Sequence, residues 1–403
     1  MAVDAALPLR SAKVQIPVIL TGLGHGATHW TVATFYFLLP MLRESLGLDY
    51  IAAGFLVTCF HIGSTAINIP SGTLVDLTGR RVLFQVISLV VGAAALAAIG
   101  IFGAYGALCI ALGVLGASNM LWHPAAIAYL SGHLPRNRGY ALAIHALGAN
   151  VGDAVAPLAA GALVASLTWQ TTAIVNGAIG VLPAFALIAV LGRGDAAAAT
   201  RAAGTSLRKY LSGMARALRT RAMWSLCLMA GFRTMMQGGL LAFLPLYLSD
   251  SLHMSPFMMG LTLMMLQVGG MIAAPIAGSL SDRIGRRPIV LAGMSSTTVL
   301  VIGLTFLGSG PLYVFGVAVL GFAMYAMRPV IHSWLMDRSP PELAASMTSA
   351  MFGVQASFSA VMPLIGGALA DAYGLVAVFY FLGASVLVAN LLALCVPKTE
   401  HAG

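Results

Sequence analysis

Apolar runs of about 20 residues or more follow one another along almost the whole of this chain. A helix needs about 20 apolar residues to cross a bilayer, and the runs are continuous, unlike the alternating strands of a membrane barrel. Charged residues make up only 8% of the chain, against roughly 25% in soluble domains, so lipid must cover most of its surface. Twelve runs can be placed, at about 14–42, 50–75, 81–103, 105–133, 139–165, 169–192, 222–249, 255–280, 287–308, 311–336, 343–370 and 374–396.

The polar stretch from Arg193 to Arg221 is the one long loop in this pattern, and it divides the runs into two sets of six. We therefore expect an all-α membrane protein with twelve transmembrane helices in two six-helix bundles, residues 1–192 and 222–403, joined by a cytoplasmic linker over 193–221. The linker, the other even-numbered loops and the termini hold 18 of the 21 lysines and arginines. Because basic loops stay on the cytoplasmic side, both termini are predicted to be cytoplasmic. The net charge of +9 lies in these loops and does not indicate nucleic acid.

Two segments of ten residues with nearly the same sequence lie about half the chain apart. Residues 72–81 read Gly-Thr-Leu-Val-Asp-Leu-Thr-Gly-Arg-Arg, and residues 278–287 read Gly-Ser-Leu-Ser-Asp-Arg-Ile-Gly-Arg-Arg. His123-Pro124 corresponds to Arg328-Pro329 at nearly the same offset. A constant offset across several helices indicates an internal duplication. Duplicated membrane proteins with many helices are most often transporters, with the site at the interface between the halves.

On these motifs the chain resembles the major facilitator superfamily over essentially its whole length. The resemblance rests on the twelve runs, their 6+6 division, the long central loop and the motif Gly-x-x-x-Asp-x-x-Gly-Arg-Arg, which is fuller in the second copy because Leu77 stands where the family has arginine. Residues 119–124 (Asn-Met-Leu-Trp-His-Pro) and the series Gly148, Gly152 and Pro157 resemble the fosmidomycin-resistance branch of exporters. The resemblance implies the major facilitator fold, alternating access and export.

The duplicated motif is predicted to gate the cytoplasmic side. Gly79 and Gly285 allow a tight turn, and the first glycine of each copy allows close helix packing. The aspartates can face a helix N-terminus or a nearby arginine, and by the resemblance these contacts latch the cytoplasmic side when the protein opens outward. The alternative is that the arginines only anchor the loops on that side. The residues assigned to gating are Gly72, Asp76, Arg80, Arg81, Gly278, Asp282, Arg283 and Arg286.

Six ionisable residues fall near the middle of the predicted helices, where a charge is costly and indicates function. Counted from the nearest basic residue at about 1.5 Å per residue, all six lie at a similar depth. By the resemblance, the first, fourth, seventh and tenth helices line a central cavity, and five of the six residues belong to them. His61 and His145 are placed nearer the membrane faces, apart from this group. The six are His25, His29, His123, Asp153, Arg233 and Arg328.

Arg328 and Arg233 are predicted to bind an anionic substrate, with His123, His29 and His25 contributing to the same site. Arginine is effectively always charged and pairs with carboxylate or phosphate through its planar fork, and the second half has no acid inside a helix. The alternative for either arginine is a structural bond to Asp153 or to backbone carbonyls.

Asp153 and His29 are predicted to carry a coupled proton, because a carboxylate or an imidazole can load and release one. A static salt bridge is the alternative for Asp153. The arginine that accompanies proton coupling in the fourth helix of the family is absent beside Gly113, which leaves uniport open. His25 and His29 share a helix face, but the sequence shows no evident carboxylate or thiolate to complete a metal site, so no metal and no other cofactor is predicted.

These observations predict a secondary active transporter and not an enzyme. It would move a small organic anion by alternating access, as proton-coupled export; the alternative is uptake or uniport of a small carboxylate or inorganic anion. A rival of another class is an intramembrane metal enzyme that uses His25, His29 and His123, and it leaves the duplication unexplained. The resemblance places the protein in the bacterial inner membrane as a multi-pass monomer.

Overall fold

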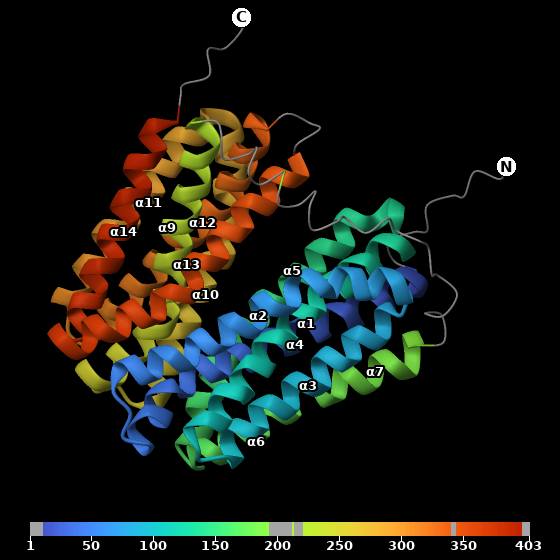
Figure 1. The fold of residues 1–403 in the computed structure, drawn as a ribbon, viewed down its shortest axis with the longest axis horizontal. Coiled ribbons are helices and arrows are strands. Elements are labelled where there is room, and N and C mark those ends of the chain that lie inside the picture. The colour runs from blue at the N-terminus through green and yellow to red at the C-terminus, as the bar shows by residue number, and fades with distance from the viewer. Residues whose placement is uncertain (1–10, 193–211, 213–220, 340–343, 397–403) are drawn as a thin grey trace, which may run out of the picture. The chain divides into compact units, whose positions relative to one another are not determined.

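The computed structural model describes residues 11–192, 212, 221–339 and 344–396, and these residues form helices and turns with no strand among them (Figure 1). The predicted all-α fold is confirmed. The predicted linker, residues 193–221, lies almost wholly outside the described residues.

The described helices occur where the apolar runs predict them. The sixth run is divided into two helices, with Gly180 between them. Two other runs end in a short helix of another type. One is a π-helix over Tyr247–Ser251, and the other is a 3-10 helix over Leu304–Phe306. The helices are α1 (Ala12–Ser45), α2 (Tyr50–Thr78), α3 (Arg81–Ile101), α4 (Tyr105–His133), α5 (Arg138–Val164), α6 (Trp169–Ala178), α7 (Val181–Leu191), α9 (Arg221–Leu246), α10 (Pro256–Ile284), α11 (Arg286–Gly303), α12 (Pro311–Arg338), α13 (Ala344–Tyr373) and α14 (Leu375–Cys395).

Eleven helical segments of the described chain are long and apolar enough to cross a membrane. The first helix, α1, is 34 residues long but does not belong to that set, because it carries a row of polar residues. These residues are buried, so they face the interior of a bundle and not lipid; they are Thr21, His25, Thr28, Thr31 and Thr34. With α1, the segments correspond to the twelve predicted runs.

The chain divides into two compact units. The first comprises residues 1–46 and 59–204, and the second comprises residues 47–58 and 205–403. The predicted halves therefore differ from the units at one place, because the first turns of α2 belong to the second unit while the rest of α2 belongs to the first. The predicted domain limits at 192 and 222 stay a prediction.

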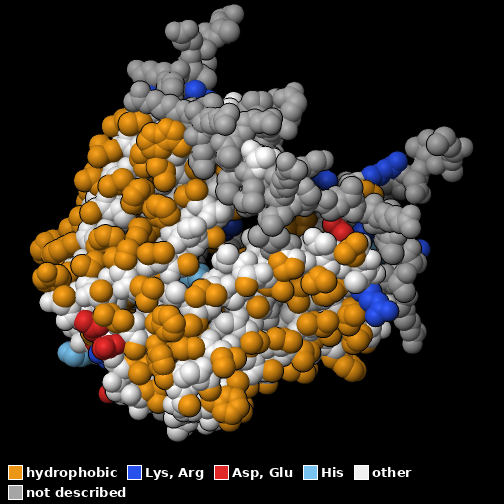
Figure 2. All heavy atoms as spheres, in the orientation of Figure 1, with side chains coloured by type: hydrophobic (Ala, Val, Ile, Leu, Met, Phe, Trp, Pro, Cys, Tyr) orange, Lys and Arg blue, Asp and Glu red, His pale blue; other side chains and the backbone are white. Residues whose placement is uncertain are grey.

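The outer surface of the helices is apolar, as a lipid environment requires. Figure 2 shows one face, on which hydrophobic side chains are spread over the helical surface with few charges among them. Large side chains such as Leu182, Phe185 and Phe306 are more than 70% exposed. Such exposure would be costly in water, and it supports the assignment of these helices to a bilayer.

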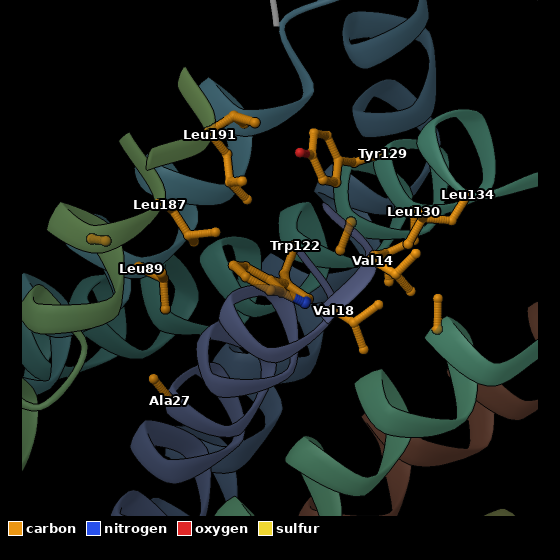
Figure 3. Close-up of a cluster of buried hydrophobic side chains, with 14 residues drawn as sticks. Val14, Val18, Ala27, Leu89, Trp122, Tyr129, Leu130, Leu134, Leu187 and Leu191 are labelled. Carbon is orange, nitrogen blue, oxygen red and sulfur yellow. The ribbon is translucent and has the colours of Figure 1, made fainter. Parts of the chain in front are cut away.

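The interior of the first unit is built around Trp122 of α4, which is fully buried (Figure 3). Val14 and Val18 of α1, Leu89 of α3 and Leu187 of α7 belong to the same hydrophobic cluster. This cluster fixes the position of the Trp122 indole, whose nitrogen points toward the polar residues described next.

Candidate functional site

Glycines bring α1 and α5 into backbone contact, and this contact positions the polar residues of the first unit. A Cβ atom on Gly148 would lie 2.0 Å from the carbonyl oxygen of Gly22, and one on Gly152 would lie 2.2 Å from that of Gly26. Only glycine permits so close an approach of two helices. Gly148 and Gly152 of α5 therefore act in helix packing.

His25 of α1 is held by a hydrogen bond to the backbone of α5. Its Nδ1 atom lies 2.7 Å from the carbonyl oxygen of His145. A carbonyl only accepts hydrogen bonds, so Nδ1 carries the hydrogen and Nε2 keeps its lone pair when the ring is neutral. That Nε2 atom is buried and has no hydrogen-bond partner among the described residues.

The His145 ring orients the His25 ring from one side. The two rings stack with centroids 3.7 Å apart and planes 12° from parallel. Trp122 donates a hydrogen bond from Nε1 to Nε2 of His145 at 3.0 Å, which fixes the tautomer of His145. The sequence placed His145 near a membrane face, apart from the six ionisable residues. That expectation is wrong, because the ring packs directly on His25.

His29, one turn after His25, pairs with Asp153 of α5. The His29 Nδ1 atom lies 3.0 Å from Oδ2 of the carboxylate, and both side chains are about one-quarter exposed. The structure thus brings together the two residues that were predicted to carry a coupled proton. Their role in coupling stays a prediction, because a static salt bridge would show the same contact.

His123 of α4 completes a group of three histidines. Its ring centroid lies 5.2 Å from that of His25 and 6.1 Å from that of His29, and the His25 and His29 centroids are 4.7 Å apart. One nitrogen from each ring lies within 4.8 Å of the others. These three rings from α1 and α4 form the polar site of the first unit, which we call the histidine cluster. Asp153 contacts it through His29.

The second unit gathers basic residues in place of the histidine cluster. Arg233 of α9 is only 4% exposed and donates a hydrogen bond to the carbonyl oxygen of Met324 at 3.2 Å. Its Nε has no hydrogen-bond partner in the described part of the chain. Arg328 of α12 lies close enough to interact electrostatically with it. His332, one turn after Arg328, interacts with both arginines and is not among the residues predicted from the sequence. We call these three residues the basic cluster.

No carboxylate of the described residues lies within ion-pairing distance of Arg233 or Arg328. The carbonyl bond of Arg233 matches the structural alternative for that residue but adds no negative charge. A buried cation without a counter-ion is costly. The basic cluster is therefore suited to a ligand that supplies negative charge.

The second copy of the loop motif forms ion pairs within its own unit. Arg286 pairs with Asp282 and with Asp337 at the end of α12, the latter at 3.0 Å. Gly79 and Gly285 have φ of +67° and +96°, so the predicted tight turns are confirmed.

The close packing expected at the first glycine of each copy is not seen. A Cβ atom on Gly72 or Gly278 would meet no atom of the described residues within 4 Å, because both positions face open space. The gating role of these residues and of Asp76, Arg80, Arg81 and Arg283 stays a prediction.

The first turns of α2 are fixed to α13 by a carboxylate that the sequence did not single out. Asp371 accepts hydrogen bonds from the backbone nitrogens of Tyr50 and Ile51, each at 2.9 Å. A carboxylate at a helix N-terminus is favourable because it meets free N–H groups and the positive end of the helix dipole. Tyr50 also donates through its hydroxyl to Asp250 at 3.0 Å. We call the contact between the Asp371 carboxylate and the N-terminus of α2 the Asp371 cap.

A duplicated set of membrane-length helices, with a polar cluster inside each half, is the architecture of a multi-pass transporter. The chain belongs to the Major Facilitator Superfamily, whose sequence profile matches residues 21–360 and 226–403. The multidrug efflux pump Tap of Mycobacterium tuberculosis is 27% identical over 361 residues, which cover 83% of this chain and 82% of that pump. The proline/betaine transporter of Escherichia coli is 29% identical over 143 residues, 33% of this chain and 27% of that transporter.

Solved structures share the fold at low sequence identity. A mutant form of the nucleoside transporter NupG aligns with a TM-score of 0.82 and 12% identity, covering 95% of this chain and 100% of that chain. A bacterial homologue of the human lysosomal transporter Spinster aligns with a TM-score of 0.76 and 15% identity, covering 96% of both chains. These similarities show the fold. The family match confirms the prediction of a major facilitator transporter.

Proposed function

We propose that this protein is a secondary active transporter that exports a small organic anion by alternating access, in exchange for protons. The basic cluster carries the proposal. Arg233 and Arg328 place two positive charges at one site of the second unit with no carboxylate of the described residues to balance them. An anionic substrate would supply that charge, and the arginine forks suit a carboxylate, phosphate or phosphonate group.

The histidine cluster is proposed as the substrate-binding group of the first unit. His25, His29 and His123 gather on α1 and α4, and His123 corresponds by duplication to Arg328. The pair of His29 and Asp153 is proposed to load and release the coupled proton, since both groups can change charge while the arginines cannot.

Export is favoured by the similarity to an efflux pump over most of the chain and by the resemblance to the fosmidomycin-resistance branch. The protein is proposed to act as a monomer in the bacterial inner membrane, with both termini cytoplasmic as the basic loops indicate. Uptake or uniport of a small carboxylate or inorganic anion by the same sites is the second candidate.

A transport assay with purified protein in liposomes tests this proposal. Organic phosphonates, carboxylates and lipophilic cationic drugs would be supplied separately, with and without an imposed pH gradient. We expect saturable movement of at least one anion, with accumulation that follows the gradient. Transport of lipophilic cations alone would contradict the anionic assignment, and transport of an anion without response to the gradient would favour uniport.

A further inference from the structure

The hydrogen bonds of His25 and His29 show which of their ring nitrogens can accept a ligand. His25 and His29 each use Nδ1 to donate, to the His145 carbonyl and to the Asp153 carboxylate. Nε2 of each neutral ring therefore carries a lone pair. His25 is only 6% exposed, and its Nε2 accepts no hydrogen bond from the described residues. A buried acceptor left in this way needs a partner from outside the protein chain, such as water or an ion.

We propose that His25, His29 and His123 bind a divalent transition-metal ion such as Zn²⁺. Neutral imidazole is a preferred ligand of Zn²⁺, Cu²⁺, Fe²⁺ and Ni²⁺, and three histidines form a known type of zinc site. The candidate nitrogens lie within 4.8 Å of one another. Zn–N bonds of about 2.0–2.1 Å in a tetrahedral arrangement require nitrogens about 3.4 Å apart. Small side-chain rotations can supply that difference.

The groups behind the rings match those that support histidine ligands at metal sites. A ligating histidine almost always donates its second ring N–H to a carboxylate or a backbone carbonyl, which fixes its tautomer and orientation. His29 does so to Asp153 and His25 does so to His145. The stacked His145 ring, itself held by Trp122, fixes the plane of His25. In this arrangement Asp153 is a supporting residue of the site and not a ligand.

The ion would change the charge of the first unit. Three neutral rings carry no charge, whereas a bound divalent ion adds two positive charges and leaves a fourth position open. An anionic group could coordinate there, so the ion would connect the histidine cluster to the anion. This extension rests on the proposed function, while metal binding itself does not.

Metal binding is measured on protein purified through a tag without histidine, treated with a chelator and dialysed. Zn²⁺ is titrated by calorimetry, and Co²⁺ is followed by its visible absorption. We expect one ion per chain and the intense Co²⁺ bands of a four-coordinate site. Binding should be lost in His25→Ala and His123→Ala. It should be weaker by about 10- to 100-fold in Asp153→Asn, the usual effect of removing a supporting carboxylate.

His332→Ala is the matched control. The Nε2 of His332 is also buried with no hydrogen-bond partner in the part of the chain that the structure describes, but His332 does not belong to the group of three. Its metal affinity should equal that of the wild type. Thermal unfolding and gel filtration show whether each variant folds; if the alanine variants do not, Asp153→Asn and the wild-type Co²⁺ spectrum decide. Less than one ion per wild-type chain, or equal affinity in Asp153→Asn and wild type, would overturn the proposal.

The extension to anions is tested on the same Co²⁺ protein. Acetate and methylphosphonate are added, and a change in the absorption bands is expected if either coordinates the ion. Unchanged bands with intact metal binding would remove the extension and leave the metal site in place. Transport without any metal dependence would likewise leave the site but separate it from the transport cycle.

Discussion

Corresponding residues of the two halves differ in chemistry although the duplication preserves the helices. His123 in α4 corresponds to Arg328 in α12, and at the same offset Asp153 in α5 corresponds to Phe358 in α13. The first unit therefore keeps an acid beside its imidazoles, and the second has an aromatic ring where that acid would be. This exchange leaves Arg233 and Arg328 without a carboxylate partner among the described residues.

Replacement of Arg328 tests the anion site most directly. Arg328→Lys should weaken substrate binding because it keeps the charge but loses the fork. Arg328→Ala should weaken it by about tenfold or more, since a charge-assisted contact is lost. Equilibrium binding of the transported anion to purified protein measures both. Arg338→Ala, at the end of the same helix, is the control and should bind normally. Unchanged affinity in Arg328→Ala would remove this residue from the site.

Replacement of the His29–Asp153 pair tests coupling. Asp153→Asn and His29→Gln should still exchange substrate across the membrane, because neither change removes the basic cluster. They should lose accumulation driven by a pH gradient, because neither amide takes up a proton. Counterflow and gradient-driven uptake in the same liposomes separate the two activities. If both variants still accumulate substrate, the pair is a structural bond.

The polar residues of the first unit depend on how closely α1 approaches α5. The glycines of α5 touch backbone oxygens of α1, so the distance between the helices leaves no room for a side chain. The second unit is packed differently at the corresponding place. Gly231 of α9 faces the side chains of Val354 and Phe358 of α13, at 2.9 and 3.3 Å from a Cβ atom placed on it.

A single methyl group at the α1–α5 contact should disturb the histidine cluster. Gly152→Ala would place Cβ 2.2 Å from the carbonyl oxygen of Gly26, so the helices must separate. We expect a loss of about 1–3 kcal/mol in stability, as in other overpacked interiors, together with loss of metal binding and coupling. Thermal unfolding in detergent measures the first effect.

Gly139→Ala on the same helix is the matched control. A Cβ atom there meets no atom of the described residues within 4 Å, and alanine favours a helix over glycine by about 1 kcal/mol. This variant should be as stable as the wild type or more so. If Gly152→Ala is equally well tolerated, the glycine contact does not determine the position of α1.

Two contacts at helix ends are our candidates for the gating of the proposed transport cycle. Arg286 joins the motif loop to α12 through Asp282 and Asp337. The Asp371 cap joins the first turns of α2 to α13. The first turns of α2 belong to the second unit and the rest of α2 to the first. By the predicted orientation, the Asp371 cap is on the side opposite the motif loops.

Variants of these two contacts should alter the rate of the cycle and leave substrate affinity nearly unchanged. Asp282→Asn and Arg286→Ala remove one contact, and Asp371→Asn weakens the other because a neutral amide binds a helix N-terminus less strongly than a carboxylate. Transport rate and equilibrium binding are compared for each. Arg287→Ala, which removes a hydrogen bond to Leu394, is the control. A variant that mainly loses binding would show that its contact belongs to the substrate site.

The positions of the helices could be predicted from the sequence, because lipid leaves no alternative to a helix of about 20 apolar residues. The turns at Gly79 and Gly285 were equally predictable, since their backbone requires a residue without Cβ. The grouping of His25, His29 and His123 followed from their depth. The duplication indicated that two halves share one architecture.

The tertiary structure decided which atoms meet. His25 donates a hydrogen bond to a backbone carbonyl. Because every residue has a backbone carbonyl, no residue type in the sequence predicts this bond. Asp371 and His145 became important only because distant helices bring them to Tyr50 and to His25. Conversely, Gly72 and Gly278 match a packing motif, but a Cβ atom on either would meet no described atom within 4 Å. A sequence pattern fixes the local backbone and the depth of a residue, whereas its partners depend on rotations and separations of helices that are set by the packing of the whole unit.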